Sequence, residues 1–128
     1  MILADTSVWI DFLAGRASAG ALRSLLAANR VICHSAVRGE LALGNIARRD
    51  EILRLLAQLP RAQVVGDDDV LALIDAKKLH ASGIGWIDVH LLASATAGRH
   101  TIWTLDKHLA SVAARLGVLA DPAGFAPK

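Results

Sequence analysis

Short apolar runs alternate along this chain with longer segments in which apolar residues recur every three or four positions. The short runs are typical of buried strands. They predict strands at 2–5, 31–34, 62–65, 100–105 and near 118–119. Because helical segments separate them, the fold expected is α/β, with a parallel sheet of four to five strands and helices on both faces.

Helical periodicity fills the intervals between these runs. Leu22, Leu25 and Leu26 recur at helical spacing in the segment 18–29. Ser35 is a favoured N-cap residue, so we expect a helix to start there. Further helices are expected after Asp5 and over 50–59, 67–79, 86–97 and 106–117.

Length and composition limit the class of protein. A chain of 128 residues predicts one domain over 1–128, with a loose tail after about residue 121. No apolar run approaches the roughly 18 residues of a membrane helix, and no secretory signal is evident. Cys33 is the single cysteine, which excludes an internal disulfide and fits a reducing compartment, so a cytoplasmic location is expected.

The charge pattern is mildly basic. The net charge is +2, from 14 basic and 12 acidic residues. Arginines gather in the first half of the chain, at 16, 23, 30, 38, 48, 49, 54 and 61. The block Asp67–Asp69 is expected to be a solvated helix start. If bound metal neutralised other acids, the remaining surface would attract a polyanion.

Four carboxylates occupy positions that a parallel sheet brings to one edge. Asp5 ends the first strand, Glu40 lies in the second turn of its helix, and Asp88 and Asp106 each begin a helix. The helix after Asp88 leads the chain about 14 Å away. The next strand returns it by roughly 16 Å. Taken alone, each acid also fits a helix cap or a solvated surface position.

Carboxylates brought this close repel one another, and a divalent cation would relieve the repulsion. Mg²⁺ prefers oxygen ligands and keeps several waters, so a cluster of acids suits it. A zinc site is not indicated, because one cysteine and five histidines lack a paired ligand spacing. His90 and His108 are expected near the acids without being ligands.

Four segments that carry these acids resemble one known family in the family's own order: "ILADTSVWIDFL", "GELALG", "GIGWIDVHLLASA" and "TIWTLDKHLASVAARLG". The sequence is similar to PIN-domain ribonucleases, and within them to VapC-type toxins of toxin–antitoxin pairs. The resemblance implies an Mg²⁺- or Mn²⁺-dependent endoribonuclease that cleaves RNA, inhibits growth, forms a homodimer and is held inactive by a VapB-like antitoxin. It also implies that Asp5, Glu40, Asp88 and Asp106 are the catalytic and metal-binding acids, supported by Thr6.

Other families with acids at strand ends differ from this sequence at the same residues. A receiver-like phosphoacceptor domain has an adjacent acid pair after its first strand, whereas Asp5 is followed by Thr6 and Ser7. A haloacid-dehalogenase-like phosphatase has Asp-x-Asp, which Ser7 breaks. A non-catalytic interaction module on the PIN fold stays open, although four intact acids count against it. Asp11 is interpreted as a helix surface residue.

Overall fold

A computed structural model describes residues 1–122. Its centre is a parallel sheet of three strands in the order β2-β1-β3. Strand β1 (Ile2–Ala4) lies between β2 (Val31–Ile32) and β3 (Thr101–Trp103), and Ile2 is paired with both Val31 and Thr101. The parallel α/β fold predicted from the sequence is confirmed.

The prediction of four to five strands is wrong for the described residues, which form three. In place of strands at 62–65 and 118–119, the structure has one isolated bridge just before the first run and one within the second. Arg61 forms an isolated bridge with Cys33, and Leu119 forms one with Ile102. Beyond the first bridge Val64 is 61% exposed, so that segment has left the sheet.

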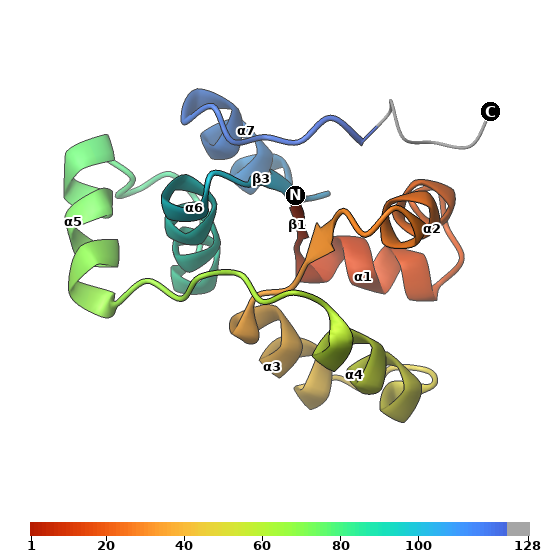
Figure 1. Ribbon diagram of the computed structural model, residues 1–128. Coiled ribbons are helices and arrows are strands. Elements are labelled where there is room, and N and C mark those ends of the chain that lie inside the picture. The colour runs from red at the N-terminus through yellow and green to blue at the C-terminus, as the bar shows by residue number, and fades with distance from the viewer. Residues whose placement is uncertain (123–128) are drawn as a thin grey trace.

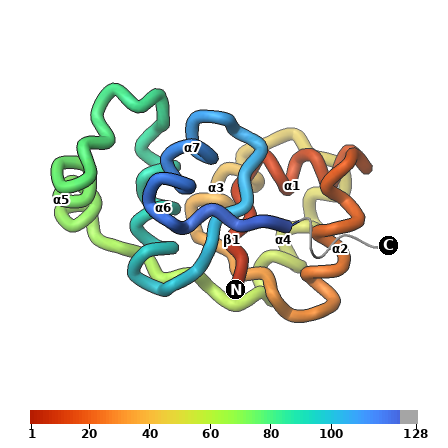
Figure 2. Tube along the Cα trace, turned by 90° about the horizontal axis from the view of Figure 1, so that it is seen from above, coloured from red at the N-terminus to blue at the C-terminus, as the bar shows by residue number. Residues whose placement is uncertain are grey.

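Seven helices are present within residues 1–122: α1 (Thr6–Leu13), α2 (Ala19–Ala27), α3 (Ser35–Leu43), α4 (Arg49–Gln58), α5 (Asp67–Lys77), α6 (Trp86–Gly98) and α7 (Lys107–Arg115). Figure 1 and Figure 2 show α1 and α2 on one side of β1, and α5 and α6 on the other. The predicted helices on both faces are therefore present. Helix α5 is the outermost on its side and packs on α6.

The core is continuous across these layers. Leu3, Trp9, Leu22, Leu92 and Ile102 are fully buried within it. Six of the seven residues of α6 from Val89 to Ala95 are buried, so this helix is enclosed on most of its sides. Burial of that much apolar surface is the main term that stabilises the fold.

Helix α3 begins differently from the sequence prediction. Ser35 is its first residue, and the N-cap is His34, whose Nδ1 accepts a hydrogen bond from the Ala36 N–H at 3.0 Å. His34 is buried, and burial lowers its pKa. The imidazole can occupy this position because its unprotonated Nδ1 is a hydrogen-bond acceptor.

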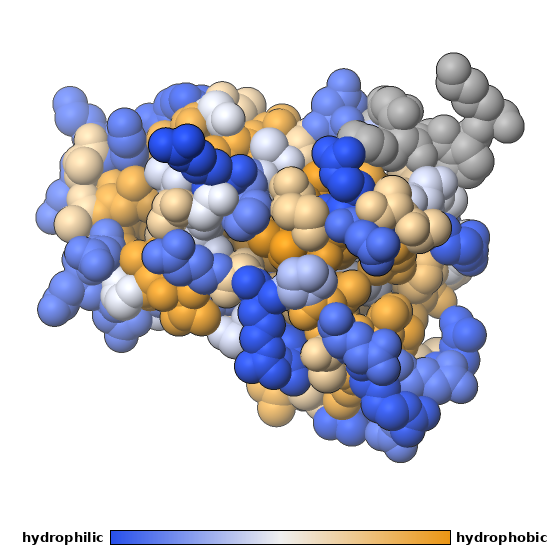
Figure 3. Space-filling view, viewed as in Figure 1, coloured by the Kyte–Doolittle hydropathy of each residue, from blue (hydrophilic) through white to orange (hydrophobic). Residues whose placement is uncertain are grey.

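Hydrophilic residues cover much of the surface seen in Figure 3, with hydrophobic ones between them. Among the helices of residues 1–122, none combines the length and the apolar character needed to cross a membrane. The tail expected to be loose falls mainly on residues 123–128, which lie outside the described part of the chain.

Candidate active site

Each of the four acids stands where a strand gives way to a helix or early in a helix. Asp5 follows β1 and is the N-cap of α1, and Asp106 is the N-cap of α7 in the turn after β3. Asp88 lies in the first turn of α6, and Glu40 lies in the second turn of α3. Because β1 and β3 are parallel neighbours, Asp5 and Asp106 leave the sheet at the same edge.

Asp5 is the most enclosed of these acids, with only 6% of its surface exposed. Its Oδ1 accepts hydrogen bonds from the Ser7 hydroxyl at 2.5 Å and from the Val8 N–H at 3.1 Å. Its Oδ2 accepts one from the Thr104 hydroxyl. The carboxylate is therefore both a helix cap and a group fixed in place at the sheet edge.

Two hydroxyls join the start of α1 to the turn between β3 and α7. The Thr104 oxygen that donates to Asp5 also accepts from the Asp106 N–H at 3.0 Å. The Ser7 oxygen accepts from the Leu105 N–H at 3.0 Å. The sequence interpretation gave Thr104 no role. The available signal was a hydroxyl two residues before Asp106 at a strand end.

Thr6 connects a third element to the site. Its hydroxyl donates to Glu40 Oε1 at 2.8 Å, which links the first turn of α1 to α3. Glu40 is otherwise exposed, so this bond gives its carboxylate a defined direction. The structure therefore brings Glu40 beside the residue that follows Asp5 in the chain.

Asp88 lies within electrostatic reach of the other three acids. Desolvation by partial burial is the largest cause that raises its pKa, and the negative charges of Asp106, Asp5 and Glu40 raise it further. One stabilising contact opposes this, because Asp88 Oδ2 accepts from the Gly85 N–H at 3.3 Å. Asp5, Glu40 and Asp106 therefore lie close enough to Asp88 for their charges to act on it.

The four acids are better suited to a cation that keeps some of its water ligands than to one bound by protein oxygens alone. Within residues 1–122, no three Asp, Glu, His or Cys side chains are arranged to bind one ion together. Mg²⁺ is usually held through one or two carboxylates and keeps several waters. Asp5 and Asp106 have already oriented one oxygen each toward helix N–H groups, at Val8 and Leu109. Such a donor set fits an ion that is bound partly through water.

The remaining polar groups have other contacts. His90 lies 3.6 Å from Asp67 and packs edge-on against Trp86. Asp11 accepts hydrogen bonds from the Ser18 N–H and hydroxyl, which lower its pKa and hold the turn between α1 and α2. These contacts give Asp11 a structural place away from the four acids.

Comparison with known proteins agrees with this geometry. The PIN domain family model matches residues 2–115. The chain is also 45% identical over 119 residues to Ribonuclease VapC32 of Mycobacterium tuberculosis, in strain CDC 1551 and in strain H37Rv. The match covers 92% of this chain and 94% of each relative.

Proposed function

Because this chain belongs to the PIN-domain family and is a homologue of its VapC-type toxins, we propose that it is a divalent-metal-dependent endoribonuclease. In this proposal it hydrolyses RNA phosphodiester bonds in the cytoplasm and thereby inhibits growth. The observation that carries the proposal is that Asp5 and Asp106 leave neighbouring parallel strands at one edge of the sheet, with Glu40 bonded to Thr6 and Asp88 within reach of the charges of the other three acids. Strand ends of such sheets are where ligands bind.

Asp5, Glu40, Asp88 and Asp106 are the proposed catalytic and metal-binding residues. If bound there, Mg²⁺ or Mn²⁺ would supply an acidified water and neutralise charge on the leaving oxygen. Besides holding the ion, these carboxylates are proposed to accept the proton that the attacking water releases. The expected products carry a 5′-phosphate and a 3′-hydroxyl.

The neighbouring hydroxyls are proposed to position these acids. Ser7 and Thr104 hold the Asp5 carboxylate from both sides, and Thr6 directs Glu40. Groups fixed before the substrate arrives need no reorganisation during the reaction. Positioning of this kind supports hydrolysis by a site that is otherwise open to solvent.

The test is cleavage of total cellular RNA with Mg²⁺, with Mn²⁺ and with chelator. Asp5→Asn, Asp88→Asn and Glu40→Gln should each abolish cleavage and growth arrest, because each removes one charged oxygen ligand. Asp106→Asn should leave a trace if that acid acts through water. Asp69→Asn, in the exposed first turn of α5, is the matched control and should stay toxic. Cleavage that persists in chelator would refute the proposal.

A VapB-like antitoxin is the proposed partner. Ile10 on α1 and Leu43 on α3 are 49% and 91% exposed, and these two helices pack together and carry Thr6 and Glu40. An apolar antitoxin segment over them would cover the acids. The co-purified complex should cleave RNA far more slowly than the free protein. An equal rate would contradict this blocking model.

We further propose that the 128 residues form one domain and that the free protein is a homodimer. Light scattering on the purified full chain measures the second point directly. A mass equal to a single chain at micromolar concentration would contradict it.

A further inference from the structure

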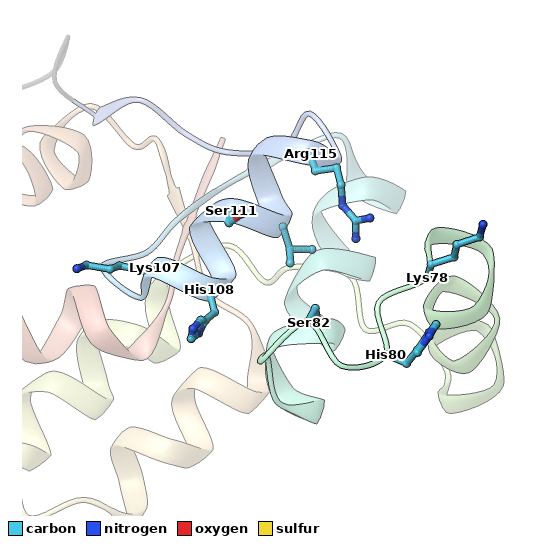
Figure 4. A pocket seen from close by; sticks show the side chains of 8 residues that line it. Lys78, His80, Ser82, Lys107, His108, Ser111 and Arg115 are labelled. Carbon is cyan, nitrogen blue, oxygen red and sulfur yellow. The ribbon is translucent and has the colours of Figure 1, made fainter.

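A cavity of about 350 Å³ lies between the end of α5, the turn that leads into α6, and α7 (Figure 4). We call it the basic pocket. It is lined by Lys78, His80, Ser82, Lys107, His108, Ser111, Val112 and Arg115. No carboxylate is among these lining residues, so its chemistry differs from that of the acidic site.

The cations of the basic pocket are not engaged in close ion pairs. Lys78, Lys107 and Arg115 form no ion pair within the part of the chain that the structure describes. The imidazoles of His80 and His108 and the Ser111 hydroxyl add further possible donors. Lys78 and Arg115 with several neutral donors around one cavity are the chemistry that binds phosphate oxygens, and Lys107 adds a third cation at the Asp106 end of α7.

One wall of the basic pocket is a turn with a constrained backbone. Lys78 and Ala81 have φ values of 53° and 59°, in the left-handed region that non-glycine residues seldom adopt. Gly83 also has a positive φ, and a Cβ there would lie 3.1 Å from His108 Nδ1. Leu79 anchors the turn in the core, and its carbonyl accepts from the Ser82 hydroxyl at 2.5 Å. The wall is therefore packed directly against α7.

The other wall is one face of α7. His108, Ser111, Val112 and Arg115 recur at helical spacing, with Val112 buried as the floor. Lys107 directly follows Asp106, and in Figure 4 it points away from the other labelled side chains. Arg115 lies eight positions after Lys107, a length of roughly 12 Å along the helix. The wall thus leads from the acidic site toward Arg115.

We propose that the basic pocket binds backbone phosphates of the RNA strand on one side of the bond that is cut. The inference rests on the proposed ribonuclease function and adds the path of the substrate. A row of cations beginning beside Asp106 fits a chain of linked phosphates, because one end of the row adjoins the reacting centre. A lone phosphate ion would need contacts at one point only.

The experiment compares two double variants of the full chain that remove the same charge. Lys78→Gln with Arg115→Gln alters the basic pocket. Lys77→Gln with Arg99→Gln is the matched control, because these residues are exposed and line no part of the pocket. Binding of a labelled single-stranded RNA of mixed sequence is measured by fluorescence anisotropy in chelator, across a salt series. Melting curves check that both variants are folded.

The pocket variant should lose about 1.4 from the slope of log affinity against log salt, since each phosphate contact on a single strand contributes roughly 0.7. The control should keep most of the wild-type slope. Equal slopes for the two variants would overturn the inference. It would also be overturned if the pocket variant kept the wild-type affinity for RNA and lost antitoxin binding only.

RNA cleavage by the wild type is scored separately. If the wild type cleaves RNA and the two variants have equal slopes, the ribonuclease proposal is supported and the basic pocket is not an RNA-binding site. If the wild type does not cleave RNA but the pocket variant loses the expected slope, the ribonuclease proposal is contradicted. The basic pocket is then still supported as a site for RNA phosphates.

Discussion

Asp5 has a structural role in addition to its proposed catalytic one. Both of its oxygens accept hydrogen bonds, from Ser7, Val8 and Thr104. An asparagine there would turn an N–H group toward one of these donors, so Asp5→Asn should destabilise the fold as well as end catalysis. Asp88 has one long hydrogen bond and acidic neighbours, so the same substitution there should have the opposite effect on stability.

The first prediction concerns Thr104, which links Asp5 to the Asp106 N–H. Thr104→Val keeps the shape and removes the hydroxyl, so it should lower the free energy of unfolding by about 2 kcal/mol. RNA cleavage should fall at least tenfold, because Asp5 loses its orientation. Urea unfolding and cleavage with Mn²⁺ measure the two effects. Thr104→Ser restores the hydroxyl and should recover most of both, and a fully active Thr104→Val protein would contradict the role.

The second prediction follows from the raised pKa of Asp88. A carboxyl whose pKa is higher in the folded state contributes stability below its unfolded pKa of about 3.9 and loses it as pH rises through the folded value. In chelator at pH 7, Asp88→Asn should therefore raise the melting temperature by a few degrees. The gain should shrink toward pH 4.

Added Mn²⁺ should reverse that order. Ligand that binds only the folded protein stabilises it, so the wild type should gain melting temperature with Mn²⁺ and Asp88→Asn should gain less. Asp69→Asn should follow the wild type throughout. A wild-type melting temperature that does not change with added Mn²⁺ would count against a shared metal site.

Helix α3 depends on an unusual cap, because His34 must stay unprotonated at Nδ1 to accept from Ala36. The third prediction is that the fold weakens as the pH falls. Burial lowers the pKa of His34, so its contribution is present above the unfolded pKa of about 6.5 and is lost as pH falls through the folded pKa. Urea unfolding between pH 7.5 and 5 measures this loss.

His34→Asn is the informative variant, since an asparagine oxygen can also cap a helix. It should be less stable than the wild type at pH 7.5, by roughly 1–3 kcal/mol, because a smaller side chain leaves a cavity. Its stability should change less toward pH 5. An identical pH dependence in the two proteins would show that His34 is not the titrating group.

Most helices could be predicted because apolar periodicity is a local property of the sequence. The runs at 62–65 and 118–119 resembled strands equally well, yet whether a run joins a sheet depends on how long it lies beside a strand edge. Ser35 is a favoured N-cap by residue type, but the N-cap in the structure is the buried His34. These outcomes depend on tertiary packing that local sequence does not specify.

The same distinction applies to the site. Asp5 and Asp106 could be placed together because parallel topology brings strand ends to one edge, and Asp88 could be placed near Asp106 because the helix and the strand between them run out and back over similar lengths. Ser7 and Thr104 could not, because their roles depend on the side-chain geometry of two turns that are far apart in sequence. The basic pocket was missed for a similar reason, since its residues come from separate segments at 78–82 and 107–115.

For the whole molecule, Cys33 offers a probe of global opening. It is 1% exposed beside the sheet, and burial raises the pKa of its thiol to about 11. The fourth prediction is that a thiol reagent labels it only when the protein unfolds, because the thiolate is the reactive form. Labelling should be at least a hundredfold slower than for the urea-unfolded chain, and Mn²⁺ should slow it further. Labelling as fast as in urea would contradict this.

The pairing of β1 with β3 also bears on how the protein is made. Ile2 is paired with Thr101, and Asp5 receives its hydrogen bond from Thr104, 99 residues later in the chain. Synthesis proceeds from the N-terminus, and contacts so distant in sequence are costly to close early in folding. Asp5 has neither Thr104 nor Asp106 beside it until translation has passed residue 106. If the proposed activity is correct, a growing chain on the ribosome has no assembled site with which to cut the message that encodes it.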